Sequence, residues 1–221
     1  MLVEIWSDVV CPWCYIGKRK FEAALAEYEH ADQVEIVWKP YQLDPTAPPG
    51  AATPVREGYA KKFGGHERAD EIIANVTGVA AGVGLDFRMD IALRANTRDA
   101  HRLIAFAGER QGAMKERLLQ AYFTQGLNIG DHDTLAELAA EVGLDRGRVI
   151  ALLDSDEGLA ELNHELAEAR EADITAVPTF VFDGRWAMPG AQEPEMFLRA
   201  FRRVEEIRAE EIRANEAEAA G

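Results

Sequence analysis

The hydrophobic positions of the first forty residues follow two different periods. Residues 2–6 (LVEIW) are rich in aromatic and β-branched side chains, which predicts a short buried strand. Apolar residues then recur at helical spacing over about residues 12–29. Alternation of apolar positions returns over residues 34–38 and predicts a second strand. The N-terminal part is therefore expected to form a strand–helix–strand unit.

The pattern in the middle of the chain is helical. Four prolines lie within residues 43–54, which predicts a loop. Over residues 55–172 the apolar positions recur at helical spacing, interrupted by glycine or Asp/Asn breaks. This pattern predicts five or six short helices. We expect residues 54–172 to form a helical insertion in a domain made of residues 1–53 and 173–221.

Strands return in the C-terminal part. Residues 179–182 predict a strand, and the turn Asp183-Gly184 joins it to a partner strand over residues 185–188. A last helix is predicted from about residue 193 to near residue 214. The order is β-α-β, a helical block, then β-β-α. This order predicts an α/β sheet domain with a large all-helical insertion.

Charge narrows the classes of partner. The 221 residues include 24 Lys and Arg against 39 Asp and Glu, a formal net charge of −15. Such a chain is repelled by phosphate backbones and anionic lipids, so we expect no nucleic acid and no membrane as partners. The sequence starts Met-Leu-Val-Glu-Ile-Trp, without a basic leader and an apolar segment behind it. We therefore expect a cytoplasmic protein.

Both cysteines of the chain lie in one motif, Cys11-Pro12-Trp13-Cys14, at the start of the first predicted helix. A zinc site would need two further ligands, and the five histidines show no paired spacing, so we expect no metal. Two inert buried thiols are a second interpretation. A redox dithiol is favoured, because helix N-terminal amides stabilise a thiolate at Cys11. Cys14, one turn further, is then placed to resolve a mixed disulfide.

The segment Val177-Pro178-Thr179 is the second candidate for the site. A proline directly before a strand often follows a cis peptide bond, and a trans proline that only begins the strand is the alternative. In the predicted sheet this loop can fold against the start of the first helix. A cis bond there would turn the backbone of Val177 toward Cys11. We expect an extended substrate to bind here, in contact also with Pro12 and Trp13.

The residues of these motifs resemble DsbA-like thiol–disulfide oxidoreductases of the FrnE type. The resemblance runs through Ser7-Asp8, the segment CPWCYIG over residues 11–17, WKPYQL over 38–43, Asn96-Thr97, AHRL over 100–103, AYF over 121–123, Ile129-Gly130, VPTFVF over 177–182 and GAQ over 190–192. It therefore covers nearly the whole chain. It implies a thioredoxin fold with a helical insertion. We expect no cofactor, with glutathione as the candidate co-substrate. The resemblance also implies Cys11 as nucleophile, Cys14 as resolving cysteine and Pro178 as the cis-proline.

One departure from the family pattern bears on the redox chemistry. Strongly oxidising members of the DsbA group carry a histidine between the two cysteines, and this chain has Trp13 there. We expect less stabilisation of the Cys11 thiolate than a histidine would give. The protein is then expected to be a milder oxidant, or a reductant.

Four polar residues outside the two motifs are further candidates. Asp8 either assists proton transfer at the thiols or bonds loop amides before the helix, and the second interpretation is favoured. Asn96 and His101 can reach the groove beside the site, although a structural role is the favoured interpretation for His101. Gln192 precedes the last helix, whose N-terminus either binds a carboxylate such as that of glutathione or is simply capped there.

Two other functions stay open on the sequence. Kappa-class glutathione transferases and 2-hydroxychromene-2-carboxylate isomerases look like the same architecture, so a glutathione-dependent isomerase or transferase is the second hypothesis. Those relatives usually carry serine at the position of Cys11, which argues against it. A peptide-binding or chaperone-like protein without catalysis is the third. Expected partners are proteins with cysteines or small thiols and disulfides. The chain is expected to be a monomer or a homodimer, since Ile207 and Ile212 extend the apolar edge of the last helix.

Overall fold

The computed structural model describes residues 1–50 and 52–219. Its centre is a four-stranded sheet with strand order β2-β1-β5-β6. The strands are β1 (Leu2–Ser7), β2 (Glu35–Pro40), β5 (Thr179–Phe182) and β6 (Trp186–Pro189). Strand β1 pairs parallel with β2 and antiparallel with β5, and β5 and β6 form an antiparallel hairpin. The predicted strands are thus confirmed, and the sheet has the topology of a thioredoxin fold.

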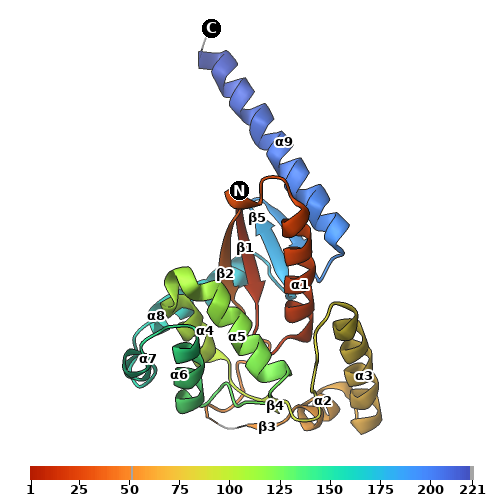
Figure 1. Ribbon diagram of the computed structural model, residues 1–221, viewed down its shortest axis with the longest axis vertical. Coiled ribbons are helices and arrows are strands. Elements are labelled where there is room, and N and C mark those ends of the chain that lie inside the picture. The colour runs from red at the N-terminus through yellow and green to blue at the C-terminus, as the bar shows by residue number, and fades with distance from the viewer. Residues whose placement is uncertain (51, 220–221) are drawn as a thin grey trace.

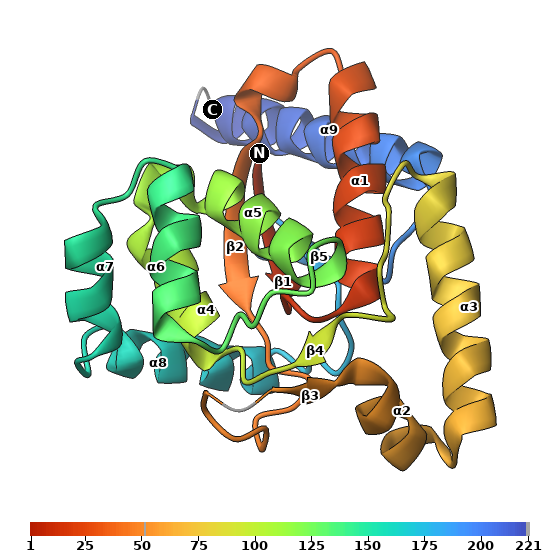
Figure 2. The same cartoon turned by 60° about the horizontal axis from the view of Figure 1, so that its bottom comes forward.

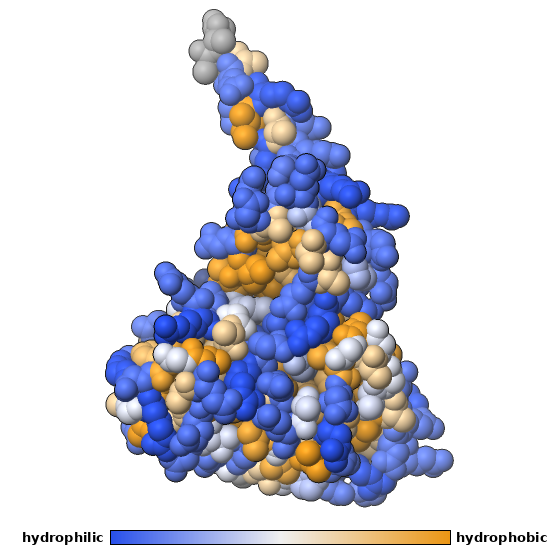
Figure 3. Space-filling model, in the orientation of Figure 1, coloured by the Kyte–Doolittle hydropathy of each residue, from blue (hydrophilic) through white to orange (hydrophobic). Residues whose placement is uncertain are grey.

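Two helices cover one face of this sheet, α1 (Pro12–Glu27) and α9 (Pro194–Ala219) (Figure 1). Phe21 of α1 stacks on Phe180 of β5, with ring centroids 5.3 Å apart, and meets Phe197 of α9 edge-on at 5.5 Å. Aromatic pairs of this kind stabilise a core beyond the area that they bury. Helix α9 continues to Ala219, past the predicted end near residue 214, and its projecting end is mostly hydrophilic (Figure 3).

The insertion between β2 and β5 is helical, as predicted, except that it also contains two short strands, which the prediction of an all-helical insertion missed. In chain order after the 3₁₀ turn η1 (Ala31–Gln33) and β2, its elements are β3 (Thr53–Pro54), α2 (Val55–Phe63), α3 (His66–Gly82), β4 (Leu93–Arg94), α4 (Arg98–Phe106), the 3₁₀ turn η2 (Gly108–Arg110), α5 (Gln111–Phe123), α6 (His132–Glu141), α7 (Arg146–Leu153) and α8 (Leu159–Glu171). Strands β3 and β4 form a separate two-stranded sheet.

The prediction of five or six helices was wrong, because α2–α8 are seven helices between residues 55 and 171. The additional helices arise because a new helix, with its own N-cap residue, begins after only a short turn. The side chain of Asp131 accepts the amide of Thr134 at the start of α6, and that of Asp145 accepts the amide of Arg148 at the start of α7. Such caps end one helix and begin another within a few residues. Hydrophobic spacing alone does not resolve breaks this short.

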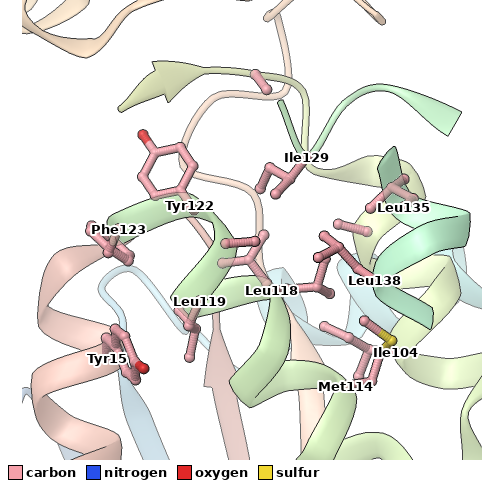
Figure 4. Packing of buried hydrophobic residues seen from close by; sticks show 14 of the residues in the cluster. Tyr15, Ile104, Met114, Leu118, Leu119, Tyr122, Phe123, Ile129, Leu135 and Leu138 are labelled. Atoms are coloured by element: carbon pink, nitrogen blue, oxygen red, sulfur yellow. The ribbon is translucent and has the colours of Figure 1, made fainter. Parts of the chain in front are cut away.

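The insertion has its own hydrophobic core, drawn in part in Figure 4. Leu118, Leu119 and Phe123 of α5 lie at its centre and are fully buried. The same cluster includes Tyr15 and Ile16 from the first turns of α1. The helix that carries both cysteines is therefore packed between the sheet domain and the insertion.

Helices α2 and α3 form an arm that reaches past the N-terminal end of α1 (Figure 2). The turn between them is possible because Gly64 adopts a left-handed conformation, with φ of 93°, which glycine reaches without strain. Helix α3 contacts α1 on one side. The arm thereby faces the start of α1, where the two cysteines lie.

Candidate functional site

Cys11 is the N-cap residue of α1 and Pro12 is its first residue. Proline suits this position because the first helical amides have no partner within the helix. The carbonyl of Cys11 accepts the amide of Cys14 at 3.0 Å, so Cys14 lies one turn into the helix. Both cysteines are free. The local sequence therefore folds as the pattern predicts, with the dithiol at a helix N-terminus.

The loop before β5 lies directly against Cys11. The Val177-Pro178 peptide bond is cis, which the sequence left open. The Cys11 thiol donates a hydrogen bond to the carbonyl oxygen of Val177, with Sγ and oxygen 3.6 Å apart. Residues 166 positions apart in the chain thus form one site. The amide of Gly190 donates to the Pro178 carbonyl at 2.7 Å and ties this loop to the end of β6.

Gly17 makes the close approach of α1 to this loop possible. A Cβ atom at Gly17 would lie 2.9 Å from Cγ of Pro178 and 3.4 Å from the backbone of Ala191. The first distance is shorter than carbon atoms tolerate, and a proline ring cannot swing aside as a long side chain does. The motif CPWCYIG contains this glycine, but only the tertiary contact shows why no side chain fits there.

Both cysteines are almost fully buried, but they differ in their position relative to a cavity and in their electrostatics. Cys11 contributes to the wall of a cavity and Cys14 does not. Burial raises the pKa of the Cys14 thiol well above its usual value, and a hydrogen bond with Cys11 raises it further. The positive charge of Lys115 acts in the opposite direction. The Cys14 thiol therefore keeps its proton in the reduced protein, and Cys11 is the cysteine that borders the cavity.

Lys115 is a functional candidate that the sequence analysis missed. It comes from α5, is 1 % exposed, and donates to the carbonyl of Ser7 at 3.3 Å. Burial lowers its pKa to about 8, while nearby Cys14, Asp8 and Cys11 favour its charged form. A single lysine in a helical run gives no signal of burial. Only the packing of α5 on the sheet places its ammonium group behind the cysteines.

Asp8 and His101 lie beside Lys115 as a fully enclosed pair. Asp8 Oδ2 accepts the amide of Leu43 at 2.8 Å, which agrees with the favoured role of a loop anchor. His101 Nε2 lies 3.3 Å from Asp8 Oδ1 and 3.0 Å from the carbonyl oxygen of Tyr41. Since both neighbours of Nε2 are acceptors, this nitrogen carries the hydrogen. His101 therefore holds the loop that precedes the helix.

A cavity of about 1230 Å³ opens beside Cys11. Its near wall is formed by Cys11, Pro12, Trp13 and Val177, and its far wall by the α2–α3 arm. Trp13 is 40 % exposed and presents its ring to this space. Basic side chains gather on the arm, although the chain as a whole is acidic. They are Lys61, Lys62 and Arg68, and they share the wall with Glu57 and Glu71.

Four of the predicted substrate-binding residues lie away from this cavity. Among the described residues that line it, Asn96, His101, Thr179 and Gln192 are not found. The Asn96 amide donates to the Ala47 carbonyl at 2.6 Å, and the Thr179 hydroxyl donates to the Ala176 carbonyl at 2.8 Å. Gln192 donates to the Pro189 carbonyl at 2.7 Å. These side chains bond to nearby backbone, whereas Pro12, Trp13 and Val177 meet at Cys11.

The described part of the chain shows neither a metal site nor a membrane-spanning helix. Within residues 1–50 and 52–219, no three His, Cys, Asp or Glu side chains converge as a metal site requires. None of the helices built from these residues has the length and the hydropathy to cross a bilayer.

Comparison with known proteins identifies the fold and the family. The model of the DSBA-like thioredoxin domain family matches residues 2–202. The chain belongs to this family. It is 32% identical over 201 residues to the uncharacterized protein YwbO of Bacillus subtilis (strain 168), an alignment that covers 90% of this chain and 94% of YwbO.

Solved structures agree with the family assignment. A probable DsbA oxidoreductase from Streptomyces coelicolor superposes with a TM-score of 0.85 at 36% identity, over 90% of this chain and 88% of that one. A 2-hydroxychromene-2-carboxylate isomerase superposes with a TM-score of 0.72 over 95% of this chain and 98% of its own, but at 15% identity. The second likeness shows a shared fold. As a DSBA-like protein with a helical insertion and the Cys11–Cys14 pair, the chain is by family and structure a DsbA-like oxidoreductase.

Proposed function

We propose that this protein is a thiol–disulfide oxidoreductase in which Cys11 attacks a substrate disulfide and Cys14 resolves the intermediate. The observation that carries the proposal is the position of Cys11. Its sulfur lies at a helix N-terminus, on a cavity wall, and within 3.6 Å of the Val177 carbonyl oxygen. A helix N-terminus stabilises the thiolate that such an attack requires.

The difference between the two cysteines supports the following order of steps. The Cys11 thiolate attacks one sulfur of the substrate, the disulfide bond breaks, and its electron pair leaves with the other sulfur as a thiolate. Cys14 then loses its proton and attacks Sγ of Cys11, which releases the second substrate thiolate. The protein ends as a Cys11–Cys14 disulfide and the substrate as a dithiol. The same steps in reverse oxidise a substrate dithiol.

The loop that contains Val177 favours a peptide as the substrate. The Val177 carbonyl accepts the Cys11 thiol, and no other side chain of the described residues bonds to it. An extended peptide beside Cys11 can replace that thiol by donating a backbone amide to the same oxygen. The adjoining cavity and the exposed ring of Trp13 offer room and an apolar contact for the residues next to the substrate cysteine. Cysteine-containing proteins are therefore the proposed partners, with small disulfides as simpler substrates.

A trapping experiment tests this function. In a Cys14→Ser variant the resolving thiol is missing, so a mixed disulfide on Cys11 should accumulate and should be visible by mass spectrometry of non-reduced protein. The Cys11→Ser variant is the matched control, and it should trap nothing and lose at least a thousandfold in disulfide exchange. If Cys11→Ser retained catalysis on a glutathione-dependent isomerisation substrate, the glutathione-dependent hypothesis would replace this one.

A further inference from the structure

Two phenol groups face the cavity from the insertion side and have no role in the steps above. Tyr59 on α2 and Tyr122 on α5 both line the cavity that Cys11 lines. Tyr122 is 3 % exposed, and Figure 4 shows its hydroxyl pointing away from Leu118 and Leu119 in the apolar cluster. The rings are thus held by packing, while a hydroxyl is directed out of the core.

Two other tyrosines of the chain donate their hydroxyls to carboxylates. Tyr15 donates to Glu116 at 2.7 Å and Tyr28 donates to Glu205 at 3.0 Å. Within residues 1–50 and 52–219, no such partner accompanies the hydroxyl of Tyr59 or Tyr122. Among the described residues, Ser7 Oγ is the one fully buried side-chain polar atom without a partner, so both phenol oxygens are open to the cavity. Each hydroxyl can therefore donate a hydrogen bond to a group that enters the cavity, which a phenylalanine could not do.

Both phenols remain hydrogen-bond donors over the whole working range of pH. Burial, followed by the proximity of Cys11, raises the pKa of Tyr59 to about 12. Burial also raises the pKa of Tyr122 well above its usual value, and Tyr59, Asp8 and Cys11 add to the shift. Neutral phenols beside a reactive thiol suit an acceptor that carries negative charge.

We propose that the hydroxyls of Tyr59 and Tyr122 bind the departing sulfur of the substrate disulfide while Cys11 attacks the other sulfur. This assignment rests on the proposed function and names the residues that serve its first step. In that step the Cys11–sulfur bond forms, the substrate disulfide bond breaks, and the negative charge moves to the leaving sulfur. The two hydroxyls donate hydrogen bonds to it and keep their own protons.

The cationic side chains of the cavity are less suited to this position. Arg94 is engaged by Asp44 in an ion pair, and Arg68 by Glu71 on the exposed face of α3. Lys61 and Lys62 are exposed on α2. A thiolate that forms next to Cys11 loses water to mostly apolar walls, so fixed donors nearby lower its energy most. The benefit grows with the basicity of the leaving thiol.

The test compares two neutral disulfides in a Cys14→Ser background, which isolates the first step. One is 4,4′-dithiodipyridine, whose thiol leaves easily, and the other is bis(2-hydroxyethyl) disulfide, whose basic thiolate needs help. Tyr122→Phe and Tyr59→Phe should each slow the second reaction by about three- to tenfold, the value of one hydrogen bond, and change the first less than twofold. Tyr28→Phe, which alters a hydroxyl bonded to Glu205, is the control and should change neither rate.

The outcomes separate the proposal from the function beneath it. Selective slowing of the hydroxyethyl disulfide supports the assignment, because loss of packing alone would slow both reactions equally. Equal slowing of both, or no slowing of either, overturns it while the proposed function stands. A Cys14→Ser parent that reacts with neither disulfide would overturn the proposed function itself.

Discussion

The sheet domain and the helical insertion are stabilised by different cores that meet along one helix. The sheet domain is packed by phenylalanines, with Phe21, Phe180 and Phe197 in mutual contact. The insertion is packed mainly by leucine and alanine, and one aromatic stack reaches it from Tyr15, whose ring centroid lies 5.9 Å from that of Phe87. Helix α1 contributes to both cores, its first turns to the insertion and its middle to the sheet.

This difference separates two tasks at the site. The sheet domain supplies Cys11, Cys14 and the Val177-Pro178 loop, which are close to each other by topology. The insertion supplies Lys115 behind the cysteines, and Tyr59 and Tyr122 on the cavity wall. A sheet domain of this topology can carry a dithiol by itself. Lys115, Tyr59 and Tyr122, which lie around the dithiol, come from the added helices.

The largest effect is expected where α1 meets the loop of the sheet domain. Gly17→Ala places a methyl group 2.9 Å from Pro178 Cγ, so the loop must move away from α1. We expect the free energy of unfolding to fall by about 1–3 kcal/mol, measured by urea denaturation. Disulfide exchange should slow by about 10- to 100-fold, because the Val177 carbonyl moves away from Cys11.

Gly78→Ala in α3 is the matched control for that change. A Cβ atom at Gly78 meets nothing within 4 Å, so the substitution only removes a flexible residue from a helix. It should raise the free energy of unfolding by about 0.5–1 kcal/mol and leave the exchange rate unchanged. Equal stability of the two variants would show that the close contact at Gly17 carries no weight.

A smaller effect is expected at the ion pairs that join the insertion to α1. Glu116 of α5 receives Lys18 at 2.6 Å, the Tyr15 hydroxyl at 2.7 Å and Arg19. Although burial opposes it, these bonds lower the pKa of Glu116 to about 2 from an ordinary 4.5. Glu116→Gln should lower the free energy of unfolding at pH 7 by about 1–2 kcal/mol, after allowance for partial exposure of the carboxylate.

The pH dependence of this loss has a defined sign. A carboxylate with a depressed pKa in the folded protein stabilises it above the unfolded pKa of about 4.5, and this contribution disappears as the pH falls toward about 2. The difference in the free energy of unfolding between the native chain and Glu116→Gln should therefore decrease as the pH falls from about 4.5 to about 2. Glu141→Gln, at an exposed pair with Arg117, is the control and should change stability by less than about 0.5 kcal/mol. A constant difference across the pH range would rule out the ionic contribution.

The smallest effect on stability is expected at Lys115. Lys115→Met removes a buried charge, which stabilises, and a hydrogen bond to the Ser7 carbonyl, which destabilises, so the free energy of unfolding should change by about 1 kcal/mol or less. The kinetics should change more. Without the positive charge the Cys14 thiolate forms less readily, so release of the second thiol should slow several-fold at pH 7 and recover at higher pH.

Stopped-flow measurement of thiol release between pH 6.5 and 9.5 follows that step. Lys39→Met is the control, because its ammonium binds Glu165 and Glu168 at 3.0 Å away from the cysteines. If the pH profile of thiol release is unchanged in Lys115→Met, Lys115 does not stabilise the Cys14 thiolate.

Most of the fold was predictable because its signals are local. The aromatic and β-branched residues of β1, the alternation in β2, the helix start at Pro12 and the prolines of the loop after β2 are each recognised within a few residues. The number of helices in the insertion was not, because the caps at Asp131 and Asp145 restart helices after short turns. The topology followed from the order of elements and was supported by the family resemblance.

The sequence by itself determined the chemistry of this protein, and the tertiary structure decided its surroundings. Two cysteines separated by two residues at a helix N-terminus define a dithiol wherever that helix lies. That Val177 meets Cys11, that Lys115 is buried, and that Tyr59 and Tyr122 share one cavity depend on contacts between distant segments. Burial and interatomic distances depend on how the helices and strands pack. Hydrophobic periodicity does not specify which side chains of two distant segments come into contact.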